Sequence, residues 1–543
     1  MKELSIPDLV DRLRASLRGA GIAAAEEDIG AIAERGFLNG ILAFEAAVKA
    51  SDPADRPDFG PSPGSGYLAP AAPEGDFARE ATAADASRAG EAQTGAFGSD
   101  GSGPGIVATL GRLRRGELSS YDIVKASLAR IEERNGLLNA FTEVRNEAAL
   151  VEARKADEEL RSGSGKAPLQ GIPIAVKDIF DVAGMATRAG TSILGSTAAL
   201  RDSAAVAALR RAGAIIIGKT SLPEFSFSPG SNNDHYGPTR NPHNTERDTG
   251  GSSAGSAAAV ADAMVLGALG SDSGGSIRIP ASFCGLVGWK PAWAWSSLEG
   301  AIGLSWSLDT VGVLTMRVED AMLMGSALGH RPFASFPKTG PGRSPSRALE
   351  GLRLGAIRGE GRGRAAADAD VLGAWDAGLD LLRQAGALVV DLEMDELPLL
   401  RAVNSAILAI EAAALHRNLQ VTRLSEYGDF ARLGLLAGWA YGPADYLRAR
   451  QALGALRRRM LARFDTIDLL CSPTMTSEAT ALGKPPKITF TAPFNALGWP
   501  ALSLPCGRGA TGLPVGLQLV GRPGDEALIF GAAAELEARL AGH

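Results

Sequence analysis

The sequence predicts an α/β fold, in which a β-sheet is covered by helices on both faces and a small helical appendage precedes it. From about residue 119 onward, short apolar runs alternate with helical segments. Ahead of them stand two amphipathic segments, set apart by a stretch poor in large apolar residues. With 543 residues, the chain is long enough to bury a large core around one broad sheet. We expect an appendage over 1–50, a linker over 51–104 and one large domain over 105–543.

The appendage begins with a helix-start pattern at Ser5, followed by Pro7 and Asp8. Apolar residues then recur at helical spacing, namely Leu9, Val10, Leu13 and Leu17. A second amphipathic segment over 25–49 carries the stripe Ile29, Ile32, Phe37, Ile41 and Phe44. Two helices cannot bury these stripes alone. They must pack on the main domain or on a second copy of the chain, and we favour a homodimer.

Residues 51–104 are rich in Pro, Gly, Ala, Ser and Asp, a composition that cannot form a packed core. The main domain then starts with a helix-capping pattern at Ser119 and Asp122. Seven apolar runs behind it are typical of strands: 172–176, 214–217, 265–269, 354–357, 388–390, 469–471 and 513–520. Helical segments lie between most of these runs, as expected for a sheet covered on both faces.

Composition and charge exclude several classes of function. The net charge of −6 offers no basic field for nucleic acid. Three scattered cysteines and five histidines show no metal-ligand spacing. The scattered cysteines suit a reducing compartment. The first 19 residues lack an apolar signal segment, and the apolar stretch over 257–270 is interrupted by Asp262. We expect a cytoplasmic protein without metal, cofactor, nucleic-acid or membrane partner.

Two glycine-rich turns that carry serines point to chemistry. They read Gly-Gly-Ser-Ser over 250–253 and Ser-Gly-Gly-Ser over 273–276. The second turn can aim consecutive backbone N–H groups at one point beside the Ser276 hydroxyl, which is the arrangement of an oxyanion hole with its nucleophile attached. A single turn of this kind is more often a simple connection, but here there are two.

Lys177 is the candidate base, because it ends an apolar run over 171–177. Burial disfavours the charged form of a lysine, and a neutral amine can activate a serine hydroxyl near neutral pH. His235 and His243 lie upstream of the serine turns, but neither forms a triad-like arrangement with them.

Together, Ile-Ala-Val-Lys-Asp at 174–178 and the two serine turns resemble the amidase signature family, whose members hydrolyse C–N bonds with a Ser-cisSer-Lys triad. The resemblance spans about 106–540 and implies a large mixed sheet. By position it implies Ser276 as nucleophile, Ser252 as the bridging serine after a cis peptide and Lys177 as base. It also implies that the backbone N–H groups of Ser273, Gly274 and Gly275, with that of Ser276, hold the oxyanion, while Asp272 and Arg278 support the loop.

Two other motifs compete with this interpretation. Ser253 stands in Gly-x-Ser-x-Gly, but the preceding residues 244–249 are polar and unsuited to the buried strand that a nucleophile elbow requires. Lys219 stands in Gly-x-x-x-x-Gly-Lys-Thr, a phosphate-loop pattern. Three isoleucines in its middle favour a strand over a phosphate-binding turn. A nucleotide-binding ATPase that uses Lys219 is the alternative from another class.

The predicted function is hydrolysis of a small non-peptide amide or ureido compound through a serine acyl-enzyme, releasing ammonia or an amine. The alternative within the family is the amidase subunit of a glutamine-dependent tRNA amidotransferase. That subunit usually has Gln where Ile279 stands, and Thr-Tyr-Gly-Arg after Lys-Pro, whereas Ala-Trp-Ala-Trp follows Lys290-Pro291 here. The first sixty residues resemble the small helical partner protein of bacterial carboxybiuret-type amidases.

Seven aromatic side chains either line the substrate pocket or belong to the core, and the sequence leaves both open. They are Phe225, Phe227, His235, Tyr236, Trp293, Trp295 and Trp306.

Overall fold

The computed structural model of the chain describes residues 4–49, 105–329, 349–361 and 366–542. The linker predicted over 51–104 lies outside the described residues.

One large mixed sheet dominates the molecule, as the sequence predicts. Its eleven strands follow the order β1-β3-β2-β6-β8-β7-β12-β13-β11-β9-β10. The strands are β1 (Phe141–Val144), β2 (Pro173–Lys177), β3 (Ile215–Thr220), β6 (Gly267–Asp272), β7 (Val287–Lys290), β8 (Thr310–Thr315), β9 (Arg353–Ala356), β10 (Leu388–Asp391), β11 (Leu469–Pro473), β12 (Ala501–Arg508) and β13 (Pro514–Val520). β2 pairs in parallel with β3 and β6, and β9 pairs in parallel with β10 and β11, whereas the other pairs are antiparallel.

All seven predicted apolar runs coincide with strands of this sheet. The sequence prediction missed β1, β7, β8 and β12, together with a separate small pair formed by β4 (Arg240–Asn241) and β5 (Asn244–Asp248).

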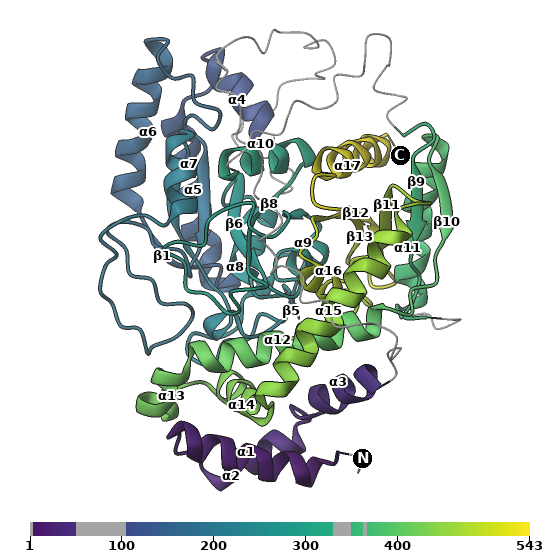
Figure 1. Cartoon of the computed structure of the whole chain (residues 1–543). Coiled ribbons are helices and arrows are strands. Elements are labelled where there is room, and N and C mark those ends of the chain that lie inside the picture. The colour runs from purple at the N-terminus through teal and green to yellow at the C-terminus, as the bar shows by residue number, and fades with distance from the viewer. Residues whose placement is uncertain (1–3, 50–104, 330–348, 362–365, 543) are drawn as a thin grey trace, which may run out of the picture.

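Helices cover both faces of the sheet (Figure 1). Alternate strand residues belong to the cores on the two faces. Ile174 and Val176 belong to the core on one face, whereas Ala175 between them belongs to the core on the other. The first face carries α4 (Ile106–Arg114), α7 (Ala204–Arg211), α10 (Val318–Leu328), α11 (Ala369–Gln384) and α17 (Glu526–Ala541). The second carries α5 (Ser120–Leu138), α6 (Asn146–Arg161), α8 (Ala254–Ala261) and α9 (Arg278–Cys284).

A helical layer packs on the second face at the C-terminal half of the sheet. It consists of α12 (Leu397–Leu415), α15 (Pro443–Arg463) and α16 (Ala492–Leu497), with α13 (Arg417–Arg423) and α14 (Asp429–Ala437) beside them. Within the described ranges, α12 is the one helix long and apolar enough to cross a membrane, and half of its most apolar window is buried. Because α12 packs on α3, α15 and α16, it serves here as a core helix.

The appendage consists of α1 (Ile6–Ala20), α2 (Glu26–Glu34) and α3 (Asn39–Lys49). Ser5 and Asp8 form the predicted capping box at the start of α1. The segment predicted as one helix over 25–49 is broken into two, and Gly36 in the break has φ +76°, a left-handed conformation.

The appendage docks on its own chain, below α12 and α14 in Figure 1. Its buried residues Leu9, Leu13, Leu17, Ile29, Ile32 and Ile41 pack with Leu433 and Leu436 of α14. Ion pairs join Arg12 to Asp445 at 2.9 Å and Arg448 to Glu45 at 2.7 Å. Of the two alternatives that the sequence left open, the structure shows packing on the main domain, so burial of these stripes does not require the favoured homodimer.

Candidate active site

Lys177 lies at the end of β2, between the strands β3 and β6. Its Nζ is 2.7 Å from the Ser252 Oγ and 2.9 Å from the Ser271 Oγ. The side chain is fully buried, and burial lowers the pKa of Lys177 to about 7, although the charges of Asp309 and Asp272 oppose this. A substantial fraction of the amine is therefore neutral at physiological pH. Sequence reasoning missed Ser271, which lies on β6, the strand beside β2.

The turn that carries Ser252 is closely packed. Its Gly251–Ser252 peptide bond is cis, as the family resemblance implied. The Asp248 carboxylate accepts hydrogen bonds from the N–H groups of Gly250 at 2.6 Å and Ser231 at 2.9 Å. A side chain at position 251 would collide with the backbone of Gly230, so only glycine fits there.

Ser276 follows β6 and is 8% exposed. The Ser253 N–H donates to the Ser276 carbonyl oxygen at 3.1 Å, which ties the two serine turns together. Within the described part of the chain, no hydrogen bond joins the Ser252 and Ser276 hydroxyls directly. The structure thus brings the Lys177 amine and the Ser252 hydroxyl into contact. The backbone hydrogen bond between Ser253 and Ser276 holds Ser276 next to the turn that carries Ser252.

The backbone N–H groups of residues 273–277, the nucleophile loop, divide into two sets. Those of Gly275 and Ile277 donate to the Asp272 carboxylate, at 2.7 Å and 3.1 Å. This corrects the expectation that the Gly275 N–H faces an oxyanion. The N–H groups of Ser273, Gly274 and Ser276 have no partner among the described residues.

Side chains from distant elements hold Ser273 in place. Its hydroxyl donates to Asp309 Oδ1 at 2.5 Å, and Asn404 of α12 donates to its carbonyl oxygen at 3.1 Å. The carbonyl oxygen of Gly274 accepts from the Thr491 hydroxyl at 2.7 Å. The loop is therefore fixed from both sides before any substrate binds.

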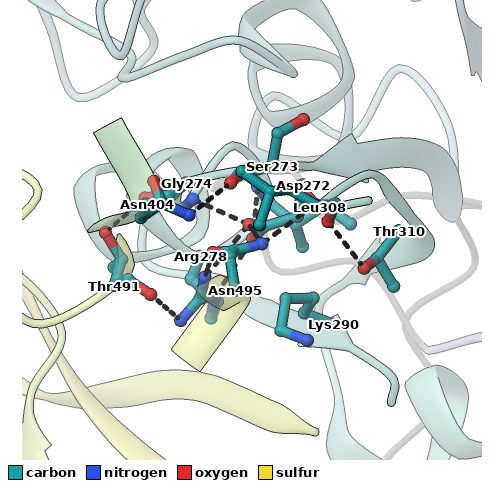
Figure 2. A network of polar contacts seen from close by, with 12 residues as sticks. Asp272, Ser273, Gly274, Arg278, Lys290, Leu308, Thr310, Asn404, Thr491 and Asn495 are labelled. Atoms are coloured by element: carbon teal, nitrogen blue, oxygen red, sulfur yellow. Dashed lines mark hydrogen bonds and ion pairs between the residues drawn. The ribbon is translucent and has the colours of Figure 1, made fainter. Parts of the chain in front are cut away.

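Asp272 and Arg278 form a fully buried ion pair at 3.0 Å beneath this loop (Figure 2). Arg278 also donates to Gln518 Oε1 at 2.7 Å, Asn495 Oδ1 at 2.6 Å and the Thr491 carbonyl oxygen at 3.0 Å. Burial alone would raise the pKa of Asp272, but the Arg278 charge and hydrogen bonds outweigh it and hold the pKa at about 2. Neither side chain lines the cavity that opens over Ser276.

A cavity of about 240 Å³ opens over Ser276. Its lining includes Ser273, Gly274, Ile279, Asn404 and several apolar side chains of α12 and α14. Of the seven aromatic residues left open by the sequence, Phe227 lines this cavity and the others do not. Phe225 packs against His416 and Trp295 against Trp289, whereas His235 lies 2.6 Å from Glu224. Tyr236 and Trp306 are exposed, and the backbone N–H of Trp293 donates to the Gly498 carbonyl oxygen.

The two competing motifs have structural roles. Ser253 is buried, and its hydroxyl donates to the Ser271 carbonyl oxygen at 3.2 Å. The polar segment before it is β5, which belongs to the small sheet and is mostly accessible to solvent. Lys219 lies inside β3, fully buried, 2.8 Å from Asp178 Oδ1. A lysine paired in this way inside a strand cannot reach a nucleotide phosphate, so the ATPase alternative is wrong.

No group of three or more His, Cys, Asp or Glu side chains is placed to hold a metal ion among the residues that the structure describes.

The comparisons with known proteins agree with this geometry. The family model described as Amidase matches residues 122–530. The A subunit of the glutamyl-tRNA(Gln) amidotransferase of Geobacter metallireducens is 36% identical over 472 residues, which cover 80% of this chain and 96% of that protein. The corresponding protein of Anaeromyxobacter sp. (strain K) is 37% identical over 461 residues, which cover 78% of this chain and 93% of that protein.

Two solved structures show the same fold. One belongs to a vestigial protein complex described as revealing the evolutionary origins of an s-triazine catabolic enzyme, with a TM-score of 0.75 and 31% identity, covering 80% of this chain and 98% of that one. The other is the native peptide amidase of Stenotrophomonas maltophilia, with a TM-score of 0.69 and 30% identity, covering 81% and 97%. The chain therefore belongs to the amidase signature family and is an enzyme that acts on amide C–N bonds.

Proposed function

We propose that the protein hydrolyses the C–N bond of a small uncharged amide or ureido compound, with Ser276 as nucleophile. The observation that carries this proposal is the buried Lys177, whose Nζ lies 2.7 Å from Ser252 and whose pKa is lowered to about 7. A neutral lysine is a base able to activate a serine near neutral pH.

In the proposed reaction, neutral Lys177 takes the Ser276 proton through the Ser252 hydroxyl, and the Ser276 Oγ attacks the amide carbon. The free N–H groups of Ser273, Gly274 and Ser276 hold the developing oxyanion. The proton returns through Ser252 to the leaving nitrogen, so that ammonia or an amine departs and an acyl-serine ester remains. Water then attacks this ester by the same proton path, the acyl group leaves as a carboxylic or carbamic acid, and the Ser276 hydroxyl is regenerated.

The cavity supports an uncharged substrate. Its described lining contains no Asp, Glu, Lys or Arg side chain. A charged group placed there would lose its hydration without gaining an ion partner, which is costly. The catalytic domain over 105–543 and a cytoplasmic location are part of the proposal.

A second candidate is the amidase subunit of a glutamine-dependent tRNA amidotransferase. The relatives at 36% and 37% identity are A subunits of glutamyl-tRNA(Gln) amidotransferases, covered over 96% and 93% of their length, and they favour this candidate over a stand-alone hydrolase. The cavity favours the first candidate, because the ammonium and carboxylate groups of glutamine need charged partners.

Ammonia or amine release by the full chain, measured with neutral primary amides, anilides, ureido compounds and glutamine, separates the two. Turnover of neutral amides that is lost in Ser276→Ala supports the first candidate. Turnover confined to glutamine supports the second and overturns the first. Release that persists at the same rate in Ser276→Ala contradicts both.

A further inference from the structure

We propose that the N-terminal appendage forms the outer wall of the substrate cavity and selects amides with an apolar acyl group of about the size of one aromatic ring. This inference rests on the proposed function, since it assigns the cavity over Ser276 to the acyl part of the substrate. Phe37 and Gly40, from the break before α3 and its first turn, line that cavity together with Ser276. The family model begins only at residue 122, so this wall lies outside the matched region.

Contacts with the main domain fix the wall in position. The Phe37 ring meets the Phe430 ring edge-on at 5.6 Å, and Phe430 lines the same cavity. Behind them, Phe44 packs edge-on against Tyr441 at 6.4 Å. The ion pair between Arg432 and Asp28, at 3.3 Å, anchors the preceding helix. The appendage is therefore tied to the main domain on both sides of Phe37.

The chemistry of the cavity defines the substrate class. Much of its lining is apolar and includes the side chains of Phe37, Phe227, Leu408, Phe430, Ala437 and Ile488. An apolar cavity of about 150 Å³ holds a benzene ring, and this one measures about 240 Å³. A ring or an alkyl chain attached to the carbonyl carbon would fill it and gain free energy from leaving water.

Gly40 offers a direct test, because its backbone conformation is open to any residue. A Cβ there meets only the Tyr441 hydroxyl, at 3.6 Å, an ordinary contact. In Gly40→Leu the new side chain therefore narrows the cavity without backbone strain. Gly30 in α2 is the matched control, since it belongs to the same appendage, is exposed and has nothing within 4 Å of an added Cβ.

The measurement is kcat/KM for acetamide, butyramide, hexanamide and phenylacetamide. We expect Gly40→Leu to lower the ratio of phenylacetamide to acetamide by at least ~10-fold, the scale of discrimination that apolar pockets achieve. Phe37→Ala should shift the preference toward longer acyl groups, and Gly30→Leu should match the wild type. Circular dichroism and melting temperature confirm that each variant is folded.

Labelling of Ser276 by methyl and octyl fluorophosphonates gives a second readout that needs no amide turnover. One outcome is that labelling proceeds with the same octyl-to-methyl rate ratio in wild type, Gly40→Leu and Phe37→Ala. In that case the appendage does not shape the cavity. This result overturns the inference and leaves the proposed function standing. If neither labelling nor amide turnover depends on Ser276, the proposed function fails, and the inference with it.

Discussion

At the scale of single residues, the proposed reaction depends on Lys177, whose pKa is lowered by burial. Lys177 ends an apolar strand, where the sequence alone leaves both an exposed and a buried lysine open. The structure shows the buried one. The motifs that predicted Lys177 as base also predicted Ser252 and Ser276. The sequence could not predict the role of Ser271 or the engagement of the Gly275 N–H, because both depend on how strands and loops meet in space.

The pKa of Lys177 leads to a prediction about pH. Since burial lowers this pKa to about 7, the neutral amine is scarce below pH 7 and dominant above it. We expect kcat/KM to rise as pH increases through 7 and to level off above, measured with an uncharged amide in constant ionic strength. Activity that falls over the same interval would contradict a neutral lysine base.

Substitutions in the proposed triad should separate activity from stability. We expect Ser276→Ala and Lys177→Ala each to lower kcat by at least ~10³, because nucleophile and base act as a unit, and Ser252→Ala to cost less. The melting temperature of Ser276→Ala should stay close to that of the wild type, since the change removes one hydroxyl at the cavity surface. A Ser276→Ala protein with wild-type kcat would eliminate Ser276 as nucleophile.

In contrast to Ser276, Arg278 should matter for stability, because it supports the nucleophile loop from below. Arg278→Met leaves the buried Asp272 carboxylate without its cation, and breaking such a pair costs about 3–5 kcal/mol of unfolding free energy. Arg353→Met is the control, because it removes a partly exposed pair with Asp468, and surface pairs of this kind contribute little to stability. Urea denaturation compares the two, and equal losses of stability would refute the assigned support role.

At the scale of secondary structure elements, the sequence predicted seven of the eleven strands of the large sheet and missed β1, β7, β8 and β12. β8 contains Gly312 and β7 contains Gly288, which weaken the strand pattern. Both glycines are explained by packing, since a side chain at Gly312 would collide with the Trp289 carbonyl oxygen and one at Gly288 with the Ala281 side chain. β12 contains Pro505, beside a register shift of its ladder. Only the assembled sheet explains why these residues suit strands.

The docking of the appendage on α14 can be tested at this scale. Leu13 is fully buried in the cluster that joins α1 to α14, so Leu13→Asp places an unpaired carboxylate there. We expect hydrogen–deuterium exchange to increase throughout α1, α2 and α3 while the strands of the sheet keep their protection. Ala15→Asp, on the exposed side of α1, serves as control and should change neither. Unchanged exchange in Leu13→Asp would show that the helices are held by something other than this contact.

At the scale of the whole molecule, the sequence predicted three segments and left two partners open for the appendage, its own main domain and a second copy of the chain. We favoured the second copy, whereas the structure shows the first. The apolar stripes showed that a partner surface was needed. They could not show that Leu433 and Leu436, about 400 residues further along the chain, supply it.

Removal of the appendage should therefore affect solubility. Deleting residues 1–50 uncovers the apolar face of α14 and opens the cavity, and an exposed face of this kind promotes association. We expect light scattering to report a higher mass per particle or precipitation. A truncated chain that stays soluble at the mass of the full protein less the deleted segment would refute this.

The buried network around Arg278 also governs when a newly made chain becomes active. The partners that hold the nucleophile loop, Thr491, Asn495 and Gln518, are translated more than 200 residues after Ser276. A ribosome-bound chain that carries Lys177, Ser252 and Ser276 still lacks the side chains that fix their loop. We therefore expect amidase activity to appear only when synthesis is nearly complete, and fragments that end before residue 491 to be inactive.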